Sequence, residues 1–162
     1  MERGHAEEAP AKPDGPVHVL PHHGVYKKEK IRVVFDAASG HPQGLNDFIR
    51  AGPNLISDLT GILLRFRFNS IGLTADLEKA FLQLSLHPAD RDVTRFLWRN
   101  SASDPDPTTY RMTRVIFGVN ASPFLLQATI RQHLNLFKSS DLELVDRLLR
   151  DIYCDDLITS VS

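Results

Sequence analysis

Residues 152–158 (Ile152-Tyr153-Cys154-Asp155-Asp156-Leu157-Ile158) decide the fold, because they set two adjacent carboxylates between two short apolar runs. This pattern predicts a β-hairpin with the acids at its tip. Two ionised carboxylates side by side repel each other, and a hard divalent cation such as Mg²⁺, bound through oxygen, relieves that repulsion. An Asp-Asp pair alone is more often a solvated turn, so a metal site requires a partner carboxylate elsewhere.

The partner that the sequence predicts is Asp76, at the end of the short β-like stretch 71–76. A strand that ends beside a hairpin can bring side chains from distant parts of the sequence together, and three carboxylates can hold a pair of divalent ions. Two metals suit phosphoryl transfer, since one activates the attacking hydroxyl and the other stabilises the leaving pyrophosphate. Taken alone, Asp76 would be a strand-to-turn cap.

Several further segments accompany these acids, and their order is more specific than any single motif. In chain order they are Leu20-Pro21-His22-His23-Gly24-Val25, Ile31-Arg32-Val33-Val34-Phe35-Asp36, Gly52-Pro53-Asn54-Leu55, Leu73-Thr74-Ala75-Asp76 with Phe81, Arg95-Phe96-Leu97-Trp98, Phe117-Gly118 with Ser122-Pro123-Phe124, and Tyr153-Cys154-Asp155-Asp156. The set resembles a reverse transcriptase, and more narrowly the polymerase of Bel/Pao-type long-terminal-repeat retrotransposons. The resemblance runs from about His5 to Leu157.

The resemblance implies an α+β fold, a polymerase palm whose antiparallel sheet is backed by helices, with a partial fingers subdomain and no thumb. Residues 1–21 would be an extended or disordered lead-in, and residues 22–162 a partial reverse transcriptase domain. Within that domain, fingers over about 22–70 and 82–118 would interleave with palm over about 71–81 and 119–162.

The resemblance also implies the chemistry and the residues that perform it. Asp76, Asp155 and Asp156 would be catalytic and, together with Leu77, would bind two Mg²⁺ ions, for which Mn²⁺ could substitute. A primer 3′-hydroxyl would attack the α-phosphate of a deoxynucleoside triphosphate on an RNA or DNA template. The implied substrate-binding residues are Arg32, Lys28, Phe81, Phe117, Gly118, Ser122 and Tyr153.

Individual roles follow from the same resemblance. Lys28 and Arg32 would grip the triphosphate from the fingers, and Phe81 would be the steric gate that excludes a 2′-hydroxyl, although a plain core phenylalanine is the ordinary interpretation. Phe117 departs from the family, because retroviral enzymes commonly carry glutamine there. Gln127, on the helix after Ser122-Pro123, is a supporting residue at most.

Local patterns predict the remaining elements. A small hairpin is expected at 25–35, a helix capped by Asn54, strands at 71–76, 82–86, 93–99 and 109–115, and a helix that begins at Ser122 with proline in its first turn. A further helix is expected over about 142–149.

Composition narrows the class of protein without deciding it. A net charge of −1 does not by itself favour a nucleic-acid binder, although Lys27, Lys28, Lys30 and Arg32 form a basic run. The single cysteine, Cys154, excludes an intrachain disulfide. No apolar run approaches the roughly 20 residues of a membrane span, and no signal sequence is evident, so we expect an intracellular, cytoplasmic protein without a membrane partner.

Two functional hypotheses remain open. The first is an RNA-directed DNA polymerase fragment, because the chain ends shortly after Asp156 and the rest of a Pol polyprotein (thumb, ribonuclease H and integrase) is expected but absent. The second is a catalytically silent remnant that keeps the palm fold and at most binds nucleic acid or associates with itself. In either case we expect apolar surface on the sheet to be exposed.

Overall fold

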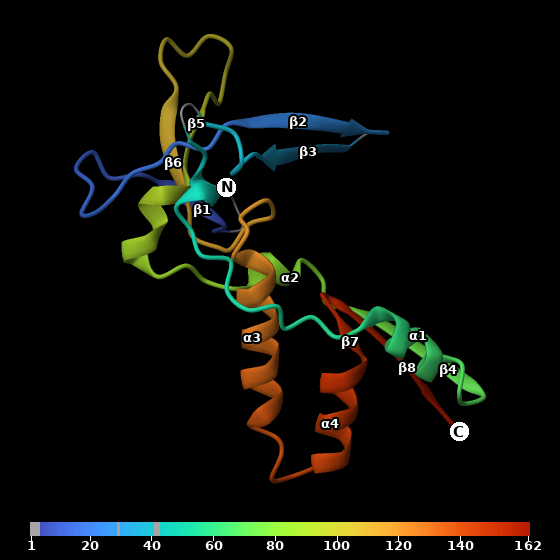
Figure 1. Ribbon diagram of the computed structural model, residues 1–162. Helices are drawn as coiled ribbons and strands as arrows, with labels where there is room; N and C mark the ends of the chain where they lie inside the picture. Colours follow the sequence, from blue (N-terminus) through green and yellow to red (C-terminus); the bar gives the residue numbers. More distant parts are fainter. Residues whose placement is uncertain (1–3, 29, 41–42) are drawn as a thin grey trace. The chain divides into compact units, whose positions relative to one another are not determined.

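The computed structural model describes residues 4–28, 30–40 and 43–162. The chain forms two compact units: unit 1 comprises Met1–Arg50 and Phe81–Ser122, and unit 2 comprises Ala51–Ala80 and Pro123–Ser162 (Figure 1). The named strands pair antiparallel throughout the described residues, and helices accompany them, so the predicted α+β class is confirmed. Among these residues no helix combines the length and apolar character needed to cross a membrane.

Unit 1 is built on a three-stranded sheet in the order β1 (Ala6–Glu8), β6 (Thr108–Met112) and β5 (Arg95–Trp98). The 3-10 helix η2 (Pro88–Thr94) leads directly into β5, and His87 caps its start. The sequence pattern placed strands at 93–99 and 109–115, and both exist with shorter bounds.

Residues 4–21, for which the sequence predicts an extended or disordered lead-in, take part in the fold of unit 1. Glu7 of β1 lies opposite Arg111 of β6, and the Leu20 amide donates to the Arg95 carbonyl at 2.7 Å. Leu20 is 1% exposed and belongs to the core of the unit. Extended backbone can add to a sheet edge, as Ala6–Glu8 does beside β6.

The hairpin of unit 1 consists of β2 (His22–Lys27) and β3 (Lys30–Phe35), as expected. The chain then passes through η1 (Leu45–Asp47), whose start is tied by the Gly44 amide donating to the Asp47 carboxylate. The buried core of the unit consists of Leu20, Ala37, Leu45, Phe96, Met112 and Ile116, and Phe35 of β3 packs against it.

The predicted strand at 82–86 is wrong. The residues enter the short helix α2 (Ala80–Gln83), and beyond it only Ser85 forms an isolated bridge, with Arg114. Leucines at every second position suggested a strand, but the Leu84 amide donates to the Phe81 carbonyl, as in a helical turn. Leu82 and Leu86 still pack against the core of unit 1.

Unit 2 contains the second three-stranded sheet, in the order β4 (Ile71–Asp76), β8 (Asp156–Val161) and β7 (Ile152–Tyr153). The strand predicted at 71–76 is confirmed, and so is the hairpin around the adjacent acids. Ile71 and Leu73 of β4 are about half exposed, as expected for the apolar surface of this sheet.

Helices α1 (Leu59–Phe66), α3 (Ser122–Asn135) and α4 (Leu142–Asp151) complete the structure. The cap predicted for α1 is wrong: Asp58 accepts from the Thr60 and Gly61 amides, whereas Asn54 forms a separate turn with the Ile56 amide. The predicted starts of α3 and α4 are confirmed. Helices α1 and α4 both contact β8, which lies at the centre of the sheet of unit 2.

Candidate active site

The acidic turn, which we define as Tyr153, Cys154, Asp155 and Asp156, joins β7 to β8. Tyr153 and Asp156 are register partners, so Cys154 and Asp155 form a two-residue loop. Cys154 has φ +54°, and a positive φ at the first central residue is the pattern of a type II′ hairpin turn. Glycine is favoured there because a left-handed conformation strains other residues by about 1–2 kcal/mol. The turn thus holds a strained, non-glycine residue between the two strands.

Asp76 lies beside this turn. Strand β4 pairs with β8 so that Asp76 is directly opposite Asp156, and the Leu77 amide donates to the Asp155 carbonyl at 2.9 Å. Directly opposite residues in an antiparallel pair have Cα atoms about 4.5–5.5 Å apart. The structure therefore brings together the backbones of the three aspartates that the sequence predicted to converge.

Among the described residues, no cation pairs with the side chains of these aspartates. Asp76 and Asp156 are exposed and Asp155 is half-buried, and within the described residues none of their carboxylates accepts a hydrogen bond or forms an ion pair. Like charges directly opposite each other destabilise a strand pair. The pKa of the neighbouring Cys154 thiol is raised by burial and then by the charges of Asp155 and Asp156.

The donor set fits a hard divalent cation, because it consists of carboxylate oxygens with no partner in the described chain. It is not a preformed cage: no three His, Cys, Asp or Glu side chains in the described ranges are close enough together to hold a metal ion as they stand. Binding would therefore require the aspartate side chains to rotate towards one another on backbones that the strand ladder already fixes.

Gln127 supports the turn from α3. Its side chain is 1% exposed, and Nε2 donates to the Cys154 carbonyl at 2.8 Å, at the residue with positive φ. Sequence analysis gave this residue only a supporting role, and the hydrogen bond makes that role specific. The sequence contains a signal for this role, because Gln127 lies at helical spacing from Ile130 and Leu134. This spacing places an amide on an otherwise apolar helix face.

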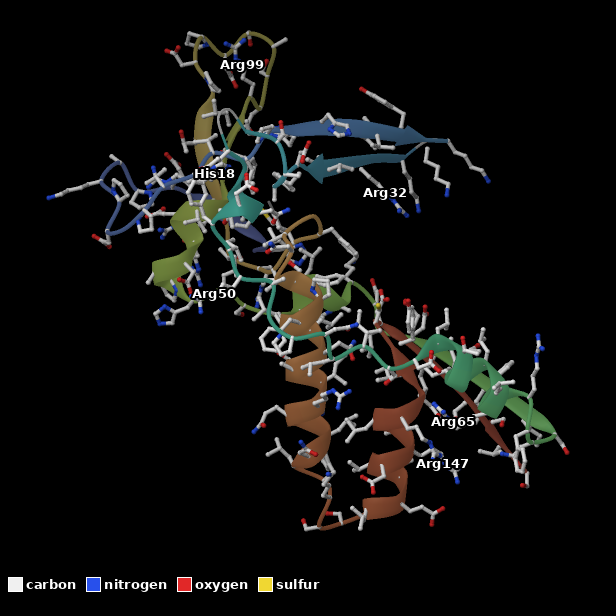
Figure 2. The ribbon with its side chains drawn as sticks, in the orientation of Figure 1. His18, Arg32, Arg50, Arg65, Arg99 and Arg147 are labelled. Carbon is white, nitrogen blue, oxygen red and sulfur yellow. The ribbon has the colours of Figure 1, made fainter. Side chains whose placement is uncertain are left out.

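The other predicted substrate-binding residues, apart from Tyr153 of the turn, lie in unit 1. The rings of Phe81 and Phe117 meet edge to face with centroids 4.3 Å apart; Phe81 is 7% exposed and Phe117 67%. Phe81 is thus a packed ring covered by its neighbour. Lys28 and Arg32 belong to the exposed hairpin, and Figure 2 labels Arg32 on β3.

Gly118 allows a close backbone approach. It has φ +92°, and a Cβ atom there would lie 2.8 Å from the Phe35 carbonyl oxygen. Two asparagines that the sequence analysis missed hold this loop: Asn46 Nδ2 donates to the Gly118 carbonyl at 2.9 Å, and the Asn120 amide donates to Asn46 Oδ1 at 2.9 Å. No local signal could reveal a pair so far apart in the sequence.

Ser122 starts α3, as predicted, but its hydroxyl is engaged within the protein. It is 2% exposed, and Oγ donates to the Ile116 carbonyl at 2.6 Å. The structure thus places the predicted residues in two groups: Asp76, Leu77, Tyr153, Asp155 and Asp156 in unit 2, and Lys28, Arg32, Phe81, Phe117, Gly118 and Ser122 in unit 1.

Comparison with solved structures finds this fold in foamy viral enzymes. The foamy viral protease-reverse transcriptase solved in complex with ds DNA matches with TM-score 0.70 and 20% identity, over 99% of this chain and 24% of that chain. The same kind of enzyme with an RNA/DNA hybrid matches with TM-score 0.66 and 20% identity, over 99% and 18% of the two chains. The native Prototype Foamy Virus enzyme gives 0.66 and 21%, over 98% and 18%.

These similarities show that the chain has a reverse transcriptase-like fold, with the arrangement of partial palm and fingers. The chain spans only 18% to 24% of the length of these solved chains. No known family profile matches the sequence, and no curated protein does.

Proposed function

We propose that the chain is part of an RNA-directed DNA polymerase, a nucleotidyltransferase that extends a primer 3′-hydroxyl with deoxynucleoside triphosphates on an RNA or DNA template. The observation that carries this proposal is the register of β4 on β8, which sets Asp76 opposite Asp156 and ties Leu77 to Asp155. Aspartates from two distant segments lie at one strand end, and no cation of the described residues pairs with them, so they are available to the metal ions that phosphoryl transfer requires.

In this proposal Asp76, Asp155 and Asp156 hold two Mg²⁺ ions, with Leu77 beside them, and Mn²⁺ can substitute. When bound, the ions supply charge stabilisation at the attacking and leaving oxygens. The residues of the chain hold the metal-binding aspartates in place. The β4–β8 ladder fixes the backbones of the acids, and Gln127 holds the turn through the Cys154 carbonyl.

In this proposal the fingers comprise residues 22–70 and 82–118 and the palm residues 71–81 and 119–162, all approximately. Lys28 and Arg32 would then contact the triphosphate, because both are exposed on the hairpin and guanidinium and ammonium groups bind phosphate. Gly118 and Phe117 would line the nucleotide pocket, with the close backbone approach at Gly118 held by Asn46. Ser122 would contribute by holding this loop, and Tyr153 by flanking the acids in β7.

Phe81 would select deoxyribonucleotides as the steric gate. Its ring is fixed by Phe117 at 4.3 Å, and a fixed ring excludes a 2′-hydroxyl better than a mobile one. Phe81→Val should therefore admit ribonucleotides in a primer-extension assay. Unchanged discrimination between the two sugars would remove this assignment.

The context that the motifs suggest is a Bel/Pao-type retrotransposon, with thumb, ribonuclease H and integrase in the remainder of a Pol polyprotein. Support comes from the motif order in the sequence.

The direct test is primer extension on an RNA template with Mg²⁺ and deoxynucleoside triphosphates, with Asp155→Asn as the control. The expected result is extension by the original chain and none by the variant. Extension that survives Asp155→Asn would contradict the metal assignment.

A catalytically silent remnant is the second candidate, and one observation favours it. Within the described residues the acids do not form a ready metal cage. A chain that folds, binds template and never extends a primer at any Mg²⁺ or Mn²⁺ concentration would establish this alternative.

A further inference from the structure

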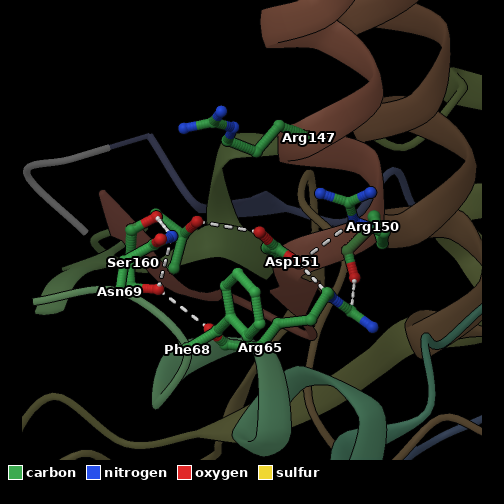
Figure 3. Close-up of a pocket in the computed structure, with 8 residues that line it drawn as sticks. Arg65, Phe68, Asn69, Arg147, Arg150, Asp151 and Ser160 are labelled. Atoms are coloured by element: carbon green, nitrogen blue, oxygen red, sulfur yellow. Dashed lines mark hydrogen bonds and ion pairs between the residues drawn. The ribbon is translucent and has the colours of Figure 1, made fainter. Parts of the chain in front are cut away.

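A hollow of about 160 Å³ lies in unit 2 (Figure 3). We name it the arginine hollow, because Arg65 of α1 and Arg147 and Arg150 of α4 line it. The rest of its lining is polar apart from Phe68, whose ring is 86% exposed.

The floor of the arginine hollow is rigid and its negative charge is already neutralised. The Asp151 side chain is 4% exposed; Oδ1 accepts from Arg65 Nε at 2.7 Å and Oδ2 accepts from Thr159 Oγ1 at 2.8 Å. Arg65 Nη2 also donates to the Arg150 carbonyl at 2.7 Å. Asn69 Nδ2 donates to both the carbonyl and the hydroxyl of Ser160. Arg65 is therefore committed to the floor.

The guanidinium groups of Arg147 and Arg150 have only weak partners in the described chain. They lie three residues apart on α4 and so share a face of the helix. Arg150 Nε is 3.6 Å from Asp151 Oδ1, an oxygen that Arg65 already occupies. Arg147 Nη2 is 3.4 Å from Glu143 Oε1, in a pair whose glutamate side chain is 88% exposed. Exposed pairs of this kind contribute little. The hollow thus carries more positive than negative charge.

We propose that the arginine hollow binds the phosphate of a nucleotide, either free or within a single strand. The planar fork of arginine matches a phosphate group, and two forks on one helix face can hold it from the same side. Phe68 offers an exposed ring beside the arginines, and aromatic rings next to a basic groove stack the bases of single-stranded nucleic acid.

The hollow is separate from the acidic turn. Ser160 lies four positions beyond Asp156 on β8, which is about 13 Å along an extended strand. The inference goes beyond the proposed function and does not depend on catalysis, so it is tested in the Asp155→Asn chain as well as in the original one.

The test uses two probes, sodium phosphate and a short fluorescent single-stranded oligodeoxynucleotide. The backbone amide signals of Thr159 and Ser160 report on the hollow by NMR, and anisotropy reports oligonucleotide affinity. The variant Arg147→Gln/Arg150→Gln removes two charges from the hollow. The matched control Arg50→Gln/Arg99→Gln removes two exposed charges from unit 1, so both variants have the same net charge.

We expect both probes, or the oligonucleotide alone, to shift the Thr159 and Ser160 signals in the original chain and in Asp155→Asn. A response to both probes identifies free phosphate as sufficient, and a response to the oligonucleotide alone identifies the strand as the source. The hollow variant should weaken binding about tenfold or more, and the control much less. Phe68→Leu should weaken oligonucleotide binding and leave phosphate binding unchanged.

Three results would overturn the proposal: no shift with either probe, shifts that persist in Arg147→Gln/Arg150→Gln, or an equal loss in the control variant. The titration of the original chain keeps the test decisive if the double variant fails to fold. If the original chain binds at the arginine hollow but does not extend a primer, the result counts against the catalytic role proposed for the acidic turn and not against the hollow. If Phe68→Leu binds the oligonucleotide as tightly as the original chain, bases do not stack on Phe68.

Discussion

The acids Glu7 and Asp92 of unit 1 and the acids beside the turn of unit 2 are stabilised differently. In unit 1, Asp92 is 4% exposed and accepts from Arg95 and Arg111, each at 3.0 Å, while Glu7 is held by Arg91 and Arg111. In unit 2, the carboxylates of the acidic turn and of Asp76 meet no protein cation in the described chain. Paired carboxylates hold unit 1 together, whereas the unpaired ones of unit 2 remain available to an external cation.

The effect of charged neighbours on pKa values also differs between the two sets of acids. Burial alone raises the pKa of Asp92, but hydrogen bonds from Arg95 and Arg111 outweigh it and lower the pKa below its ordinary value. Glu7 behaves alike: burial opposes its ionisation, and Arg111 and Arg91 still lower its pKa. Near the acidic turn the charges act on Cys154 instead, where they add to burial in raising the pKa of the thiol. Arginines thus favour the ionised form of Glu7 and Asp92, whereas Asp155 and Asp156 disfavour the ionised form of the neighbouring Cys154.

The largest predicted effect tests the unpaired set. Asp76→Asn should lower the rate of Mg²⁺-dependent primer extension by on the order of a thousandfold, because a lost ligand removes several kcal/mol of transition-state stabilisation. In the absence of metal the same variant should be slightly more stable, since it relieves the repulsion between Asp76 and Asp156. Extension rates and urea unfolding measure the two effects. A marked loss of stability would show that Asp76 is structural.

The next effect tests the paired set. Asp92→Asn should lower the free energy of unfolding by about 3 kcal/mol, because it leaves the buried Arg95 and the half-buried Arg111 without their shared carboxylate. Glu8→Gln is the matched control, since Glu8 is exposed on β1 of the same sheet, and it should change stability by less than about 0.5 kcal/mol. Equal effects of the two variants in urea unfolding would contradict the structural role of the network.

The contrast between the two sets also separates what the sequence predicts from what it does not. The strand that ends in Asp76 and the hairpin around Asp155 follow local rules of alternation and turn chemistry, and both are present. The network of unit 1 joins residues such as Glu7 and Arg111 that are far apart in the sequence. No local pattern indicates which arginine will meet which acid, so the sequence predicts only an extended or disordered lead-in and not its pairing with β6.

Errors inside the elements have local physical causes. Helix α1 begins after Asp58 rather than Asn54, because the Asn54 side chain forms a turn with the Ile56 amide. Leucines at 82, 84 and 86 mimic a strand but belong to a short helix and an irregular segment. For the candidate site, the sequence predicts which residues take part and in which order they occur along the chain. Its support by Gln127 and the Asn46 clamp depends on tertiary contacts.

A smaller predicted effect concerns the contacts that hold the unpaired acids of unit 2 in place. Gln127→Leu should lower the free energy of unfolding by about 1–2 kcal/mol, because the half-buried Cys154 carbonyl loses its donor. Primer extension should fall further than stability explains, since the turn that carries Asp155 loosens. Gln132→Leu is the control, as Gln132 is exposed on the same helix. Hydrogen exchange at the Cys154–Asp156 amides would reveal the loosening, and unchanged exchange would contradict it.

The smallest effect concerns pH and the paired set alone. The folded pKa values of Glu7 and Asp92 lie below their ordinary values, so each carboxylate stabilises the folded state at any pH above its unfolded pKa. That contribution is lost as the pH falls below about 4 and passes through the folded pKa values. The stability of the original chain should therefore decline on acidification, and Glu7→Gln/Asp92→Asn, less stable at neutral pH, should decline less steeply. Urea unfolding at a series of pH values measures both slopes. Parallel slopes would mean that other groups govern acid stability and that the arginines of unit 1 do not distinguish its carboxylates from those of the turn.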